Sequence, residues 1–364
     1  MTEPVRDKIA SVAVIGSASV HTWRFLRGIA PHVEQVYLAC NGEIPTDVAA
    51  LLAGSLTVDF RLAALGTAAR LRAWLRETRP RLLHIHQANS VAWHGSRAAA
   101  SLDLPTVLTA WGSDVLLLPD SNPLMRAMVR ANLLAADAIT SDSLHMAAKI
   151  RELAGEGCRI RLLNYGMDAL PLPAASAGKG RTVLSCRLHK PLYRIDAILR
   201  AWQRVERSGR FGDWRLSVAA SGSETEALKC LAAELGLSRV DFAGFVDSAT
   251  LGRMYAESRV FVSVPRSDAT SISLLEAMGH GCLPLLSNLP ANGEWVIDGL
   301  NGVIAEDVGR LGEQLLRAME WAGDDARLDE VAALNRRLVA DKGLHQANMA
   351  GFAQLYRELL NPDH

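Results

Sequence analysis

The chain has 364 residues, of which 49% are hydrophobic and 21% are charged, and its formal net charge is zero. These values are typical of a globular protein, the length predicts two domains, and the balanced charge argues against a nucleic-acid partner. The five cysteines are scattered and include no CxxC pair, which supports neither a zinc site nor a disulfide framework.

The first residues, MTEPVRDKIA, are polar and are followed at once by a strand pattern, so we expect no signal peptide. No run of about 18 apolar residues follows anywhere in the chain, so we expect no membrane span. These features predict a protein of the reducing cytoplasm.

Short apolar runs alternate with longer helical patterns along the chain, which indicates α/β units with parallel sheets. The predicted strands of the first half are Val12–Ile15, Val36–Cys40, Leu82–His86, Thr106–Thr109 and Ala138–Thr140. Those of the second half are Thr182–Cys186, Leu216–Ala219, Val240–Phe242, Val260–Val264 and Leu283–Ser287. The stretch PLPAASAGKG, residues 171–180, has the composition of an interdomain linker. We therefore predict two Rossmann-like domains, residues 1–172 and 181–340.

The turn after the first strand contains Gly16 and Ser17 and leads into a helix with His21 near its start. It lacks the GxGxxG pattern of dinucleotide-binding proteins. We expect His21 to be partly exposed.

Polar residues also follow the next strands. His84 and His86 share one face of a strand, and no third ligand is apparent, so no metal site is predicted. His84 is expected in the core, whereas His86 and Asn89, nearer the strand's end, are expected to line a cleft. Trp111 and Asp114 follow the next strand in the same way.

Residues 68–79, AARLRAWLRETR, combine an apolar stripe with a basic face. Leu71, Trp74 and Leu75 recur at helical spacing among four arginines. Two interpretations stay open: a surface helix of a Rossmann-like domain with a solvated basic face, or a helix that lies on an anionic membrane.

The strands of the second half are followed by cations and a glycine turn. Arg187, Lys190 and Arg194 follow the first of these strands, where they suit a diphosphate. Ser221 and Gly222 follow the next strand, and Gly222 would let the backbone approach a ligand closely.

The most informative stretch is 265–284, PRSDATSISLLEAMGHGCLP, between two buried strand patterns. Asp268 precedes a helix whose predicted N-terminus contains Thr270, Ser271 and Ile272, where backbone N–H groups and the helix dipole favour a phosphate. Side chains on a helix tilt toward its N-terminus, so Glu276 can lean back toward a ligand bound there. Two acids flanking a phosphate site suit a nucleotide-sugar. The alternative is an ordinary βαβ unit with solvated acids.

This stretch resembles the carboxylate-x7-carboxylate signature of the retaining GT-B glycosyltransferases of family 4. The resemblance runs through most of the chain and is strongest over residues 183–302. It implies the GT-B fold, with a cleft between two Rossmann-like domains and a C-terminal helix, residues 341–364, that packs back on the N-terminal domain. It also implies a hexosyltransferase-type enzyme that needs no cofactor and no metal.

The resemblance implies roles for the donor-binding residues. Glu276 would hold the ribose, and Arg187 would bind the diphosphate. Asp268, at a position where the family usually has Glu, would contact the donor sugar. The family's second cation has no clean counterpart, so Lys190 and Arg194 both stay open. The resemblance implies further donor contacts in the two turns, at the helix start, and from backbone groups near Phe245 that would read the base. The residues concerned are Gly16, Ser17, Ser221, Gly222, Phe245, Thr270, Ser271 and Ile272.

The implied acceptor or sugar contacts lie in the first half. They are His21, His86, Asn89, Trp111 and Asp114. Trp111 stands where many family members have a sugar-binding His, so it either stacks on a sugar or is structural. Asp114 would bind hydroxyl groups or act on the acceptor.

We therefore predict a retaining transfer of a sugar from a nucleotide-diphosphate sugar to a hydroxyl acceptor, in bacterial glycan or glycolipid (polysaccharide or lipopolysaccharide) biosynthesis. The acceptor would be a glycan, a glycolipid or a small molecule. Peripheral contact with the inner membrane face and a homodimer stay open. Two alternatives remain: a non-catalytic GT-B subunit that supports a partner transferase, and a nucleotide-sugar 2-epimerase.

Overall fold

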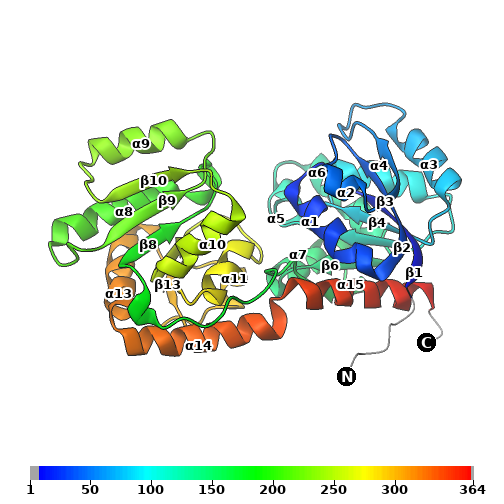
Figure 1. The fold of residues 1–364 in the computed structure, drawn as a ribbon. Coiled ribbons are helices and arrows are strands. Elements are labelled where there is room, and N and C mark those ends of the chain that lie inside the picture. Colours follow the sequence, from blue (N-terminus) through cyan, green and yellow to red (C-terminus); the bar gives the residue numbers. More distant parts are fainter. Residues whose placement is uncertain (1–7, 362–364) are drawn as a thin grey trace, which may run out of the picture. The chain divides into compact units, whose positions relative to one another are not determined.

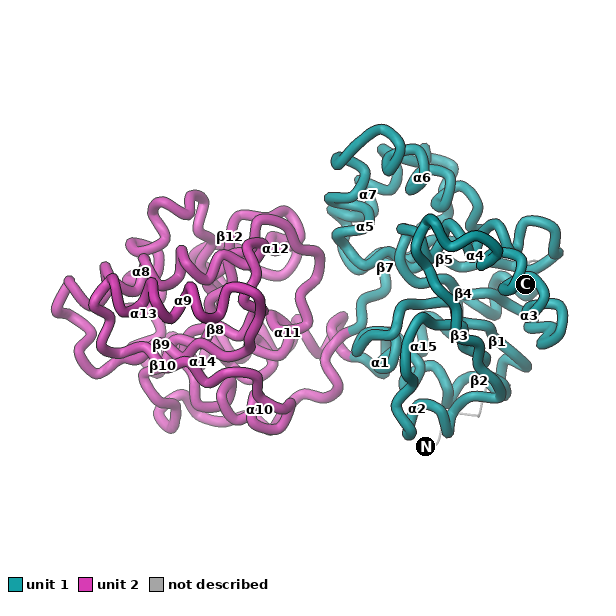
Figure 2. The backbone as a smooth tube through the Cα atoms, turned by 90° about the horizontal axis from the view of Figure 1, so that it is seen from above, with its two compact units in different colours: residues 1–165, 345–364 teal, residues 166–344 magenta. Residues whose placement is uncertain are grey.

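The structure is a computed structural model and describes residues 8–361. The sequence prediction about a signal peptide concerns mainly residues 1–7, which lie outside the described residues. The chain forms two compact units, one of residues 1–165 and 345–364 and one of residues 166–344 (Figures 1 and 2).

Unit 1 is built on a seven-stranded sheet in the order β3-β2-β1-β4-β5-β6-β7, in which all neighbours run parallel. The strands are β1 Ile9–Ile15, β2 Val33–Cys40, β3 Leu52–Thr57, β4 Leu82–His86, β5 Thr106–Thr109, β6 Ala138–Ser141 and β7 Ile160–Leu162. The helices are α1 Val20–Ile29, α2 Thr46–Ala49, α3 Thr67–Thr78, α4 Ser90–Ala99, α5 Ser113–Leu116, α6 Pro123–Leu134, α7 Leu144–Ala154 and α15 His345–Leu360.

Unit 2 contains a six-stranded parallel sheet in the order β10-β9-β8-β11-β12-β13. The strands are β8 Thr182–Ser185, β9 Arg215–Ala219, β10 Val240–Gly244, β11 Val260–Ser263, β12 Leu283–Ser287 and β13 Val303–Ala305. The helices are α8 Ile195–Ser208, α9 Thr225–Glu234, α10 Ser248–Glu257, α11 Ile272–Gly279, α12 Pro290–Gly293, α13 Leu311–Gly323 and α14 Asp325–Lys342.

Each sheet reverses its strand order at one point, between β1 and β4 in unit 1 and between β8 and β11 in unit 2. In open parallel sheets a crevice forms outside the carboxyl ends of the strands at such a point, and ligands bind there. The predicted α/β class with two Rossmann-like halves is confirmed, and each half has one such position.

The expected linker is part of unit 2. Lys179 is 6% exposed, and its Nζ donates to the carbonyl oxygens of Tyr255, Ala256 and Ser258. Arg259, 5% exposed, donates in turn to the carbonyl oxygen of Lys179. Because these buried cations are satisfied by backbone carbonyls, the segment is fixed to the unit despite its soft composition. The chain passes between the units at 165–166 and 344–345 instead.

Helix α15, red in Figure 1, belongs to unit 1. Phe352 packs edge-on against Phe25, with 5.2 Å between the ring centroids. The hydroxyl of Tyr356 lies 2.5 Å from Nδ1 of His84, whose Nε2 lies 2.6 Å from the hydroxyl of Thr109. His84 is therefore a satisfied core residue. The helical tail breaks at Gly343 and Leu344, so α14 and α15 are separate helices.

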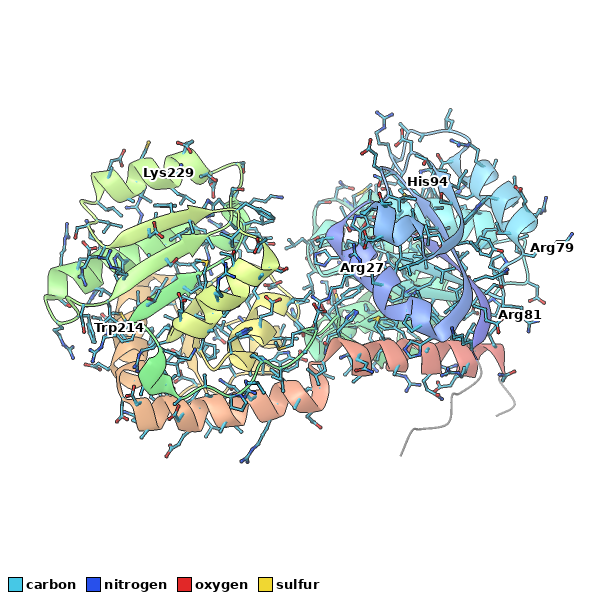
Figure 3. All side chains as sticks on the ribbon, in the orientation of Figure 1. Arg27, Arg79, Arg81, His94, Trp214 and Lys229 are labelled. Atoms are coloured by element: carbon cyan, nitrogen blue, oxygen red, sulfur yellow. The ribbon has the colours of Figure 1, made fainter. Side chains whose placement is uncertain are left out.

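Helix α3 contains the arginine-rich segment of the sequence. Its apolar stripe is inside unit 1, since Leu71, Trp74 and Leu75 are 0%, 8% and 2% exposed. The interpretation as a surface helix of a Rossmann-like unit is confirmed, and the stripe is not available to a membrane. Arg79 and Arg81, on the turn after α3, lie at the surface (Figure 3). Among residues 8–361, no helix is long and apolar enough to cross a bilayer.

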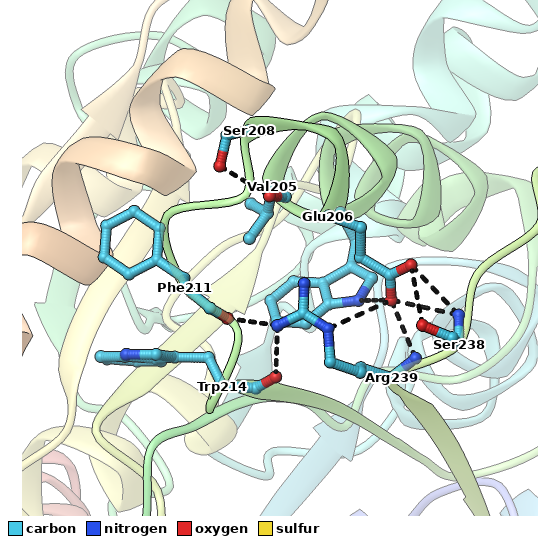
Figure 4. Close-up of polar contacts among 8 residues, drawn as sticks. Val205, Glu206, Ser208, Phe211, Trp214, Ser238 and Arg239 are labelled. Atoms are coloured by element: carbon cyan, nitrogen blue, oxygen red, sulfur yellow. Dashed lines mark hydrogen bonds and ion pairs between the residues drawn. The ribbon is translucent and has the colours of Figure 1, made fainter.

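A polar network fixes the end of α8 to the amino ends of β9 and β10 (Figure 4). Glu206 accepts from the backbone N–H of Arg239 at 2.8 Å and from the indole N–H of Trp202 at 3.0 Å. The guanidinium of Arg239 donates to the carbonyl oxygens of Phe211 and Trp214. Burial alone would raise the pKa of Glu206, but the hydrogen bonds from the backbone and Trp202 outweigh it and lower the pKa.

Candidate functional site

The reversal point of unit 2 contains an ion pair. Arg187 follows β8, and its Nη1 lies 2.8 Å from Oδ2 of Asp268, which follows β11. Nη1 also donates to the hydroxyl of Ser271, the N-cap residue of α11. The Arg187 and Asp268 side chains are only 11% and 20% exposed. The structure thus brings together the predicted diphosphate-binding, sugar-binding and helix-start residues.

Tyr193 completes the surroundings of Arg187. The guanidinium carbon lies 4.5 Å from the centroid of the Tyr193 ring. Burial lowers the pKa of Arg187, but the carboxylate of Asp268 and the Tyr193 hydroxyl outweigh burial and raise the pKa above its ordinary value. A fixed cation at this position can hold a phosphate as well, because a guanidinium has five N–H donors.

The two candidates for the second cation differ. Arg194, in a left-handed conformation with φ of 51°, donates from Nε to the carbonyl oxygen of Val264 at 2.7 Å and from Nη2 to that of Pro265 at 3.1 Å. It therefore holds the chain at the end of β11. Lys190 is exposed. Of the two side chains, the exposed Lys190 is therefore the better placed to reach a bound ligand.

The turn after β9 is joined to the loop that contains Arg187. The backbone of His189 pairs with Ser221 at 3.3 Å and with Glu224 at 3.0 Å, and Nδ1 of His189 lies 2.9 Å from the hydroxyl of Thr225. A Cβ on Gly222 would collide with the backbone of His189. The glycine is thus required by a close approach between the turn after β9 and the loop that contains Arg187.

The start of α11 is held from the side. Thr270 accepts from the indole N–H of Trp295 at 3.2 Å, and Trp295 is 4% exposed. Helix α11 begins at Ile272, one or two residues later than the sequence indicates, with Ser271 as its N-cap. The backbone N–H groups of this first turn lie beside the Arg187–Asp268 pair, which makes the position suitable for an anion.

Glu276 lies further along α11 and is half-buried. Its Oε2 accepts from the hydroxyl of Tyr255 at 3.1 Å, and the same hydroxyl lies 3.1 Å from Sγ of Cys186. Cys186 directly precedes Arg187, which pairs with Asp268. Glu276 is therefore linked to the Arg187–Asp268 pair through Tyr255 and Cys186. Phe245, after β10, is 79% exposed.

In unit 1 the reversal point is formed by the turn after β1 and the end of β4. The hydroxyl of Ser17 donates to Oε1 of Gln87 at 2.9 Å, and the hydroxyl of Thr22 donates to the carbonyl oxygen of Ser17 at 2.7 Å. A Cβ on Gly16 would lie 3.2 Å from the Thr22 hydroxyl and 3.4 Å from Cβ of His86. The turn is therefore tight, and Gly16 itself is buried.

An aromatic cluster lies beside this turn. The ring of Trp111 is 5.2 Å from that of His21 and 5.8 Å from that of His86, and Tyr165 lies 6.5 Å from both Trp111 and His86. His21 is exposed, as expected. His86 is 0% exposed, and burial, with a smaller contribution from His21, lowers its pKa to about 3. His86 is thus a neutral residue beneath the cluster rather than part of an open surface.

The side chains of Asp114 and Asn89 accept hydrogen bonds from backbone N–H groups. Asp114 is 4% exposed and accepts from the N–H groups of Ala88 at 2.6 Å and Trp111 at 2.9 Å. Burial raises the pKa of Asp114, and these amides oppose only part of that effect. The side chain of Asn89 caps α4 by accepting from the N–H of Val91 at 2.9 Å. These contacts join the loops after β4 and β5 and do not turn either side chain toward a ligand.

Sequence reasoning missed the tyrosines of both sites. Tyr193 and Tyr255 contact Arg187 and Glu276, and Tyr165 closes the aromatic cluster. Tyr193 stands between Lys190 and Arg194, so its position was a usable signal. Tyr255 lies in α10, outside the motif that begins at Pro265, and its sequence position carries no such signal. Among residues 8–361, no group of three or more His, Cys, Asp or Glu side chains is placed to hold a metal ion.

Two family models match the chain. Residues 8–143 match Glycosyl transferase 4-like, and residues 180–320 match Glycosyl transferases group 1. No curated protein matches the sequence.

Several solved structures are similar over nearly the whole chain. Sucrose-phosphate synthase from Thermosynechococcus elongatus has a TM-score of 0.80 at 17% identity, with 97% of this chain and 100% of that chain covered. Anabaena HepE in complex with UDP has a TM-score of 0.79 at 14% identity, with the coverage again 97% and 100%. The lipopolysaccharide outer core galactosyltransferase WaaB has a TM-score of 0.71 at 15% identity and the same coverage, 97% and 100%. At these identities the likeness establishes a shared fold.

Proposed function

We propose that this chain, which has the GT-B fold and matches Glycosyl transferase 4-like over residues 8–143 and Glycosyl transferases group 1 over residues 180–320, is a retaining, hexosyltransferase-type glycosyltransferase. It moves a sugar from a nucleoside-diphosphate sugar to a hydroxyl acceptor. The observation that carries this proposal is the meeting of Arg187, Asp268 and Ser271 at the reversal point of unit 2, with Glu276 on the same helix as Ser271.

The donor's diphosphate binds at the first turn of α11, opposite the guanidinium of Arg187. Glu276 accepts hydrogen bonds from the ribose, and Asp268 accepts from a hydroxyl of the transferred sugar. HepE supports this ligand class, since its structures contain UDP, and one contains UDP-glucose. Lys190 is the second cation, because Arg194 is occupied with the carbonyl oxygens of Val264 and Pro265.

In the reaction, the bond between the anomeric carbon and the diphosphate oxygen breaks, and the acceptor oxygen bonds to that carbon on the same face. The acceptor's proton passes to the departing diphosphate oxygen, so no protein nucleophile is needed. Arg187 and the start of α11 stabilise the charge that develops on the diphosphate. We propose that these groups take the place of a metal ion.

The acceptor is a hydroxyl-bearing glycan, glycolipid or small molecule, and it is contacted by the His21–Trp111 side of the aromatic cluster. The similar WaaB is a lipopolysaccharide outer core galactosyltransferase, which supports a role in bacterial glycan biosynthesis.

A thermal-shift panel of UDP, GDP, ADP, dTDP and CMP, each with common sugar conjugates and with or without magnesium, tests the proposal. Because a ligand that binds only the folded protein raises the melting temperature, one nucleotide should give a clear shift. The shift should be the same with and without magnesium. No shift with any nucleotide would support the non-catalytic subunit. NMR of the donor incubated without acceptor excludes or reveals 2-epimerisation.

A further inference from the structure

The hydroxyl of Tyr255 bridges two residues next to the donor site. It lies 3.1 Å from Oε2 of Glu276 on α11 and 3.1 Å from Sγ of Cys186 at the end of β8. Tyr255 itself is on α10 and is 1% exposed. Three elements of unit 2 therefore meet at one buried hydroxyl group, directly behind the carboxylate that we assign to the ribose.

The direction of the hydrogen bonds follows from the chemistry of the three groups. An ionised carboxylate only accepts, so the hydroxyl of Tyr255 donates to Glu276. The thiol of Cys186 and the hydroxyl of Ser273, which also hydrogen-bonds Tyr255, then donate to the Tyr255 oxygen. Burial raises the pKa of Cys186 and raises that of Tyr255 well above its ordinary value, so both groups keep their protons. The chain of bonds thus ends on one defined oxygen of Glu276.

The Tyr255 ring is held as firmly as its hydroxyl. The ring of His280 stacks on it, with 5.4 Å between centroids and 27° between planes, and Phe261 lies 6.1 Å away on β11. His280 is anchored by a 2.8 Å contact from Nδ1 to the carbonyl oxygen of Glu276. The backbone carbonyl of Tyr255 accepts from the buried Lys179 at 3.2 Å. Because both the backbone and the ring of Tyr255 are held in place, its hydroxyl can hold the carboxylate of Glu276 in one orientation.

We propose that Tyr255 is a positioning residue that sets the carboxylate of Glu276 for the vicinal hydroxyls of a ribose. The site consequently selects ribonucleoside diphosphates and their sugars over 2′-deoxyribonucleotides such as dTDP-sugars. This inference rests on the proposed function. A carboxylate with one oxygen fixed is preorganised to accept from the diol, and a site built to bind a hydroxyl rejects the analogue that lacks it.

Calorimetric titration of the preferred ribonucleoside diphosphate and its 2′-deoxy analogue tests the proposal in four proteins: wild type, Tyr255→Phe, Glu276→Gln and the double variant. We expect wild type to prefer the ribonucleotide by about 10- to 100-fold, the range of one hydrogen bond to a charged group. Tyr255→Phe should reduce this preference to about threefold or less. The double variant should resemble Glu276→Gln, since the two residues act as one unit.

Tyr356→Phe is the matched control. It also removes the hydroxyl of a fully buried tyrosine, but one that contacts His84 in unit 1, and it should keep the wild-type preference. Full preference in a folded Tyr255→Phe protein would overturn the inference. Unchanged preference in Glu276→Gln would overturn both the inference and the assigned role of Glu276, whereas loss in Glu276→Gln alone would overturn only the role of Tyr255.

Should Tyr255→Phe not fold, His280→Leu tests the same arrangement. It removes the stacked ring from a half-buried position and leaves the Tyr255 hydroxyl in place. A reduced ribose preference is expected, and an unchanged preference would contradict the proposal.

Discussion

Nη1 of Arg187 lies 2.8 Å from Oδ2 of Asp268, so two residues that we assign to different parts of the donor contact each other. Both side chains are mostly buried, and Asp268 also accepts from the N–H of Ala269 at 3.1 Å. The pair therefore gives the site its shape: the aspartate fixes the guanidinium, whose Nη1 also donates to the hydroxyl of Ser271 at the start of α11. We therefore expect substitution of Arg187 to weaken nucleoside-diphosphate binding, and substitution of Asp268 to lower kcat without weakening that binding.

Arg187→Met removes the buried cation that we assign to the diphosphate. We expect the dissociation constant of the nucleoside diphosphate to rise at least about tenfold, because a charge-assisted hydrogen bond is lost. Calorimetric titration measures the change. Arg200→Met, a change at an exposed arginine on α8, should leave binding unaltered. Equal affinities of wild type and Arg187→Met would show that the diphosphate binds elsewhere.

Asp268→Asn keeps the size of the side chain but removes its charge. We expect kcat to fall at least about tenfold, because the contact with the transferred sugar weakens. The affinity for the nucleoside diphosphate, which has no sugar to contact, should stay the same or increase as Arg187 loses its counterion. Steady-state kinetics and titration together check both parts. A weaker diphosphate complex with normal kcat would contradict this role.

The two candidates for the second cation can be told apart by substitution. Arg194→Met should lower the melting temperature, since it removes bonds to the carbonyl oxygens of Val264 and Pro265. Lys190→Ala should leave stability unaltered, because the side chain is exposed, and weaken diphosphate binding, more so at low salt. The reverse result, with binding lost only in a stable Arg194→Met protein, would reassign the cation.

Gly222→Ala tests the junction between the two donor loops. The added Cβ collides with the backbone of His189, and overpacking of this kind costs about 1–3 kcal/mol. We expect lower stability together with weaker nucleotide binding. Gly212→Ala is the matched control in the same unit, because a Cβ there meets nothing within 4 Å. If Gly222→Ala binds nucleotide as tightly as Gly212→Ala, the loop junction does not shape the site.

The neutral state of His86 predicts a dependence of stability on pH. The pKa of His86 in the folded protein, about 3, lies below the ordinary value of 6.5. Between these two pH values His86 is therefore mostly neutral in the native state and mostly protonated in the unfolded chain. The stabilisation is complete above pH 6.5 and is lost as the pH falls from 6.5 toward 3. One such proton changes the unfolding free energy by up to about 1.4 kcal/mol per pH unit.

Urea unfolding between pH 5 and pH 7.5 measures this dependence. In His86→Leu the slope of stability against pH should be smaller than in wild type by about the contribution of one proton. His84, whose pKa burial also lowers well below its usual value, should keep part of the slope in that variant. An identical slope in both proteins would mean that His86 is protonated as readily in the native state as in the unfolded chain, against the lowered pKa.

Much of the fold could be predicted from the sequence, because every central strand is a short apolar run. The strands β3, β7 and β13 were missed. All three are edge strands: β3, Leu52–Thr57, alternates half-buried and exposed residues around Gly54, and β7 and β13 have three residues each. β3 and β7 contain no fully buried residue, so their apolar patterns are weak, and β13 is buried but too short to show a pattern. The linker was misplaced because composition does not reveal the buried contacts of Lys179.

The site could be predicted where a motif determines local structure. Asp268, Ser271 and Arg187 meet because they follow β8 and β11, which are neighbours at the reversal point. The functions of Asp114 and Asn89 in holding loops could not be foreseen, because their partners are backbone N–H groups. Tyr255 could not be foreseen either, since it reaches Glu276 from a separate helix.

The most direct test of the account is titration of the nucleoside diphosphate selected by the thermal-shift panel into wild type and Glu276→Gln. Glu276 is the residue on which the assignment of unit 2 as the donor-binding unit depends. We predict saturable binding to wild type that is independent of magnesium and at least about tenfold weaker in Glu276→Gln, while the melting temperature of the variant without nucleotide stays close to that of wild type. Equal binding by both proteins, or binding by neither, would contradict the account.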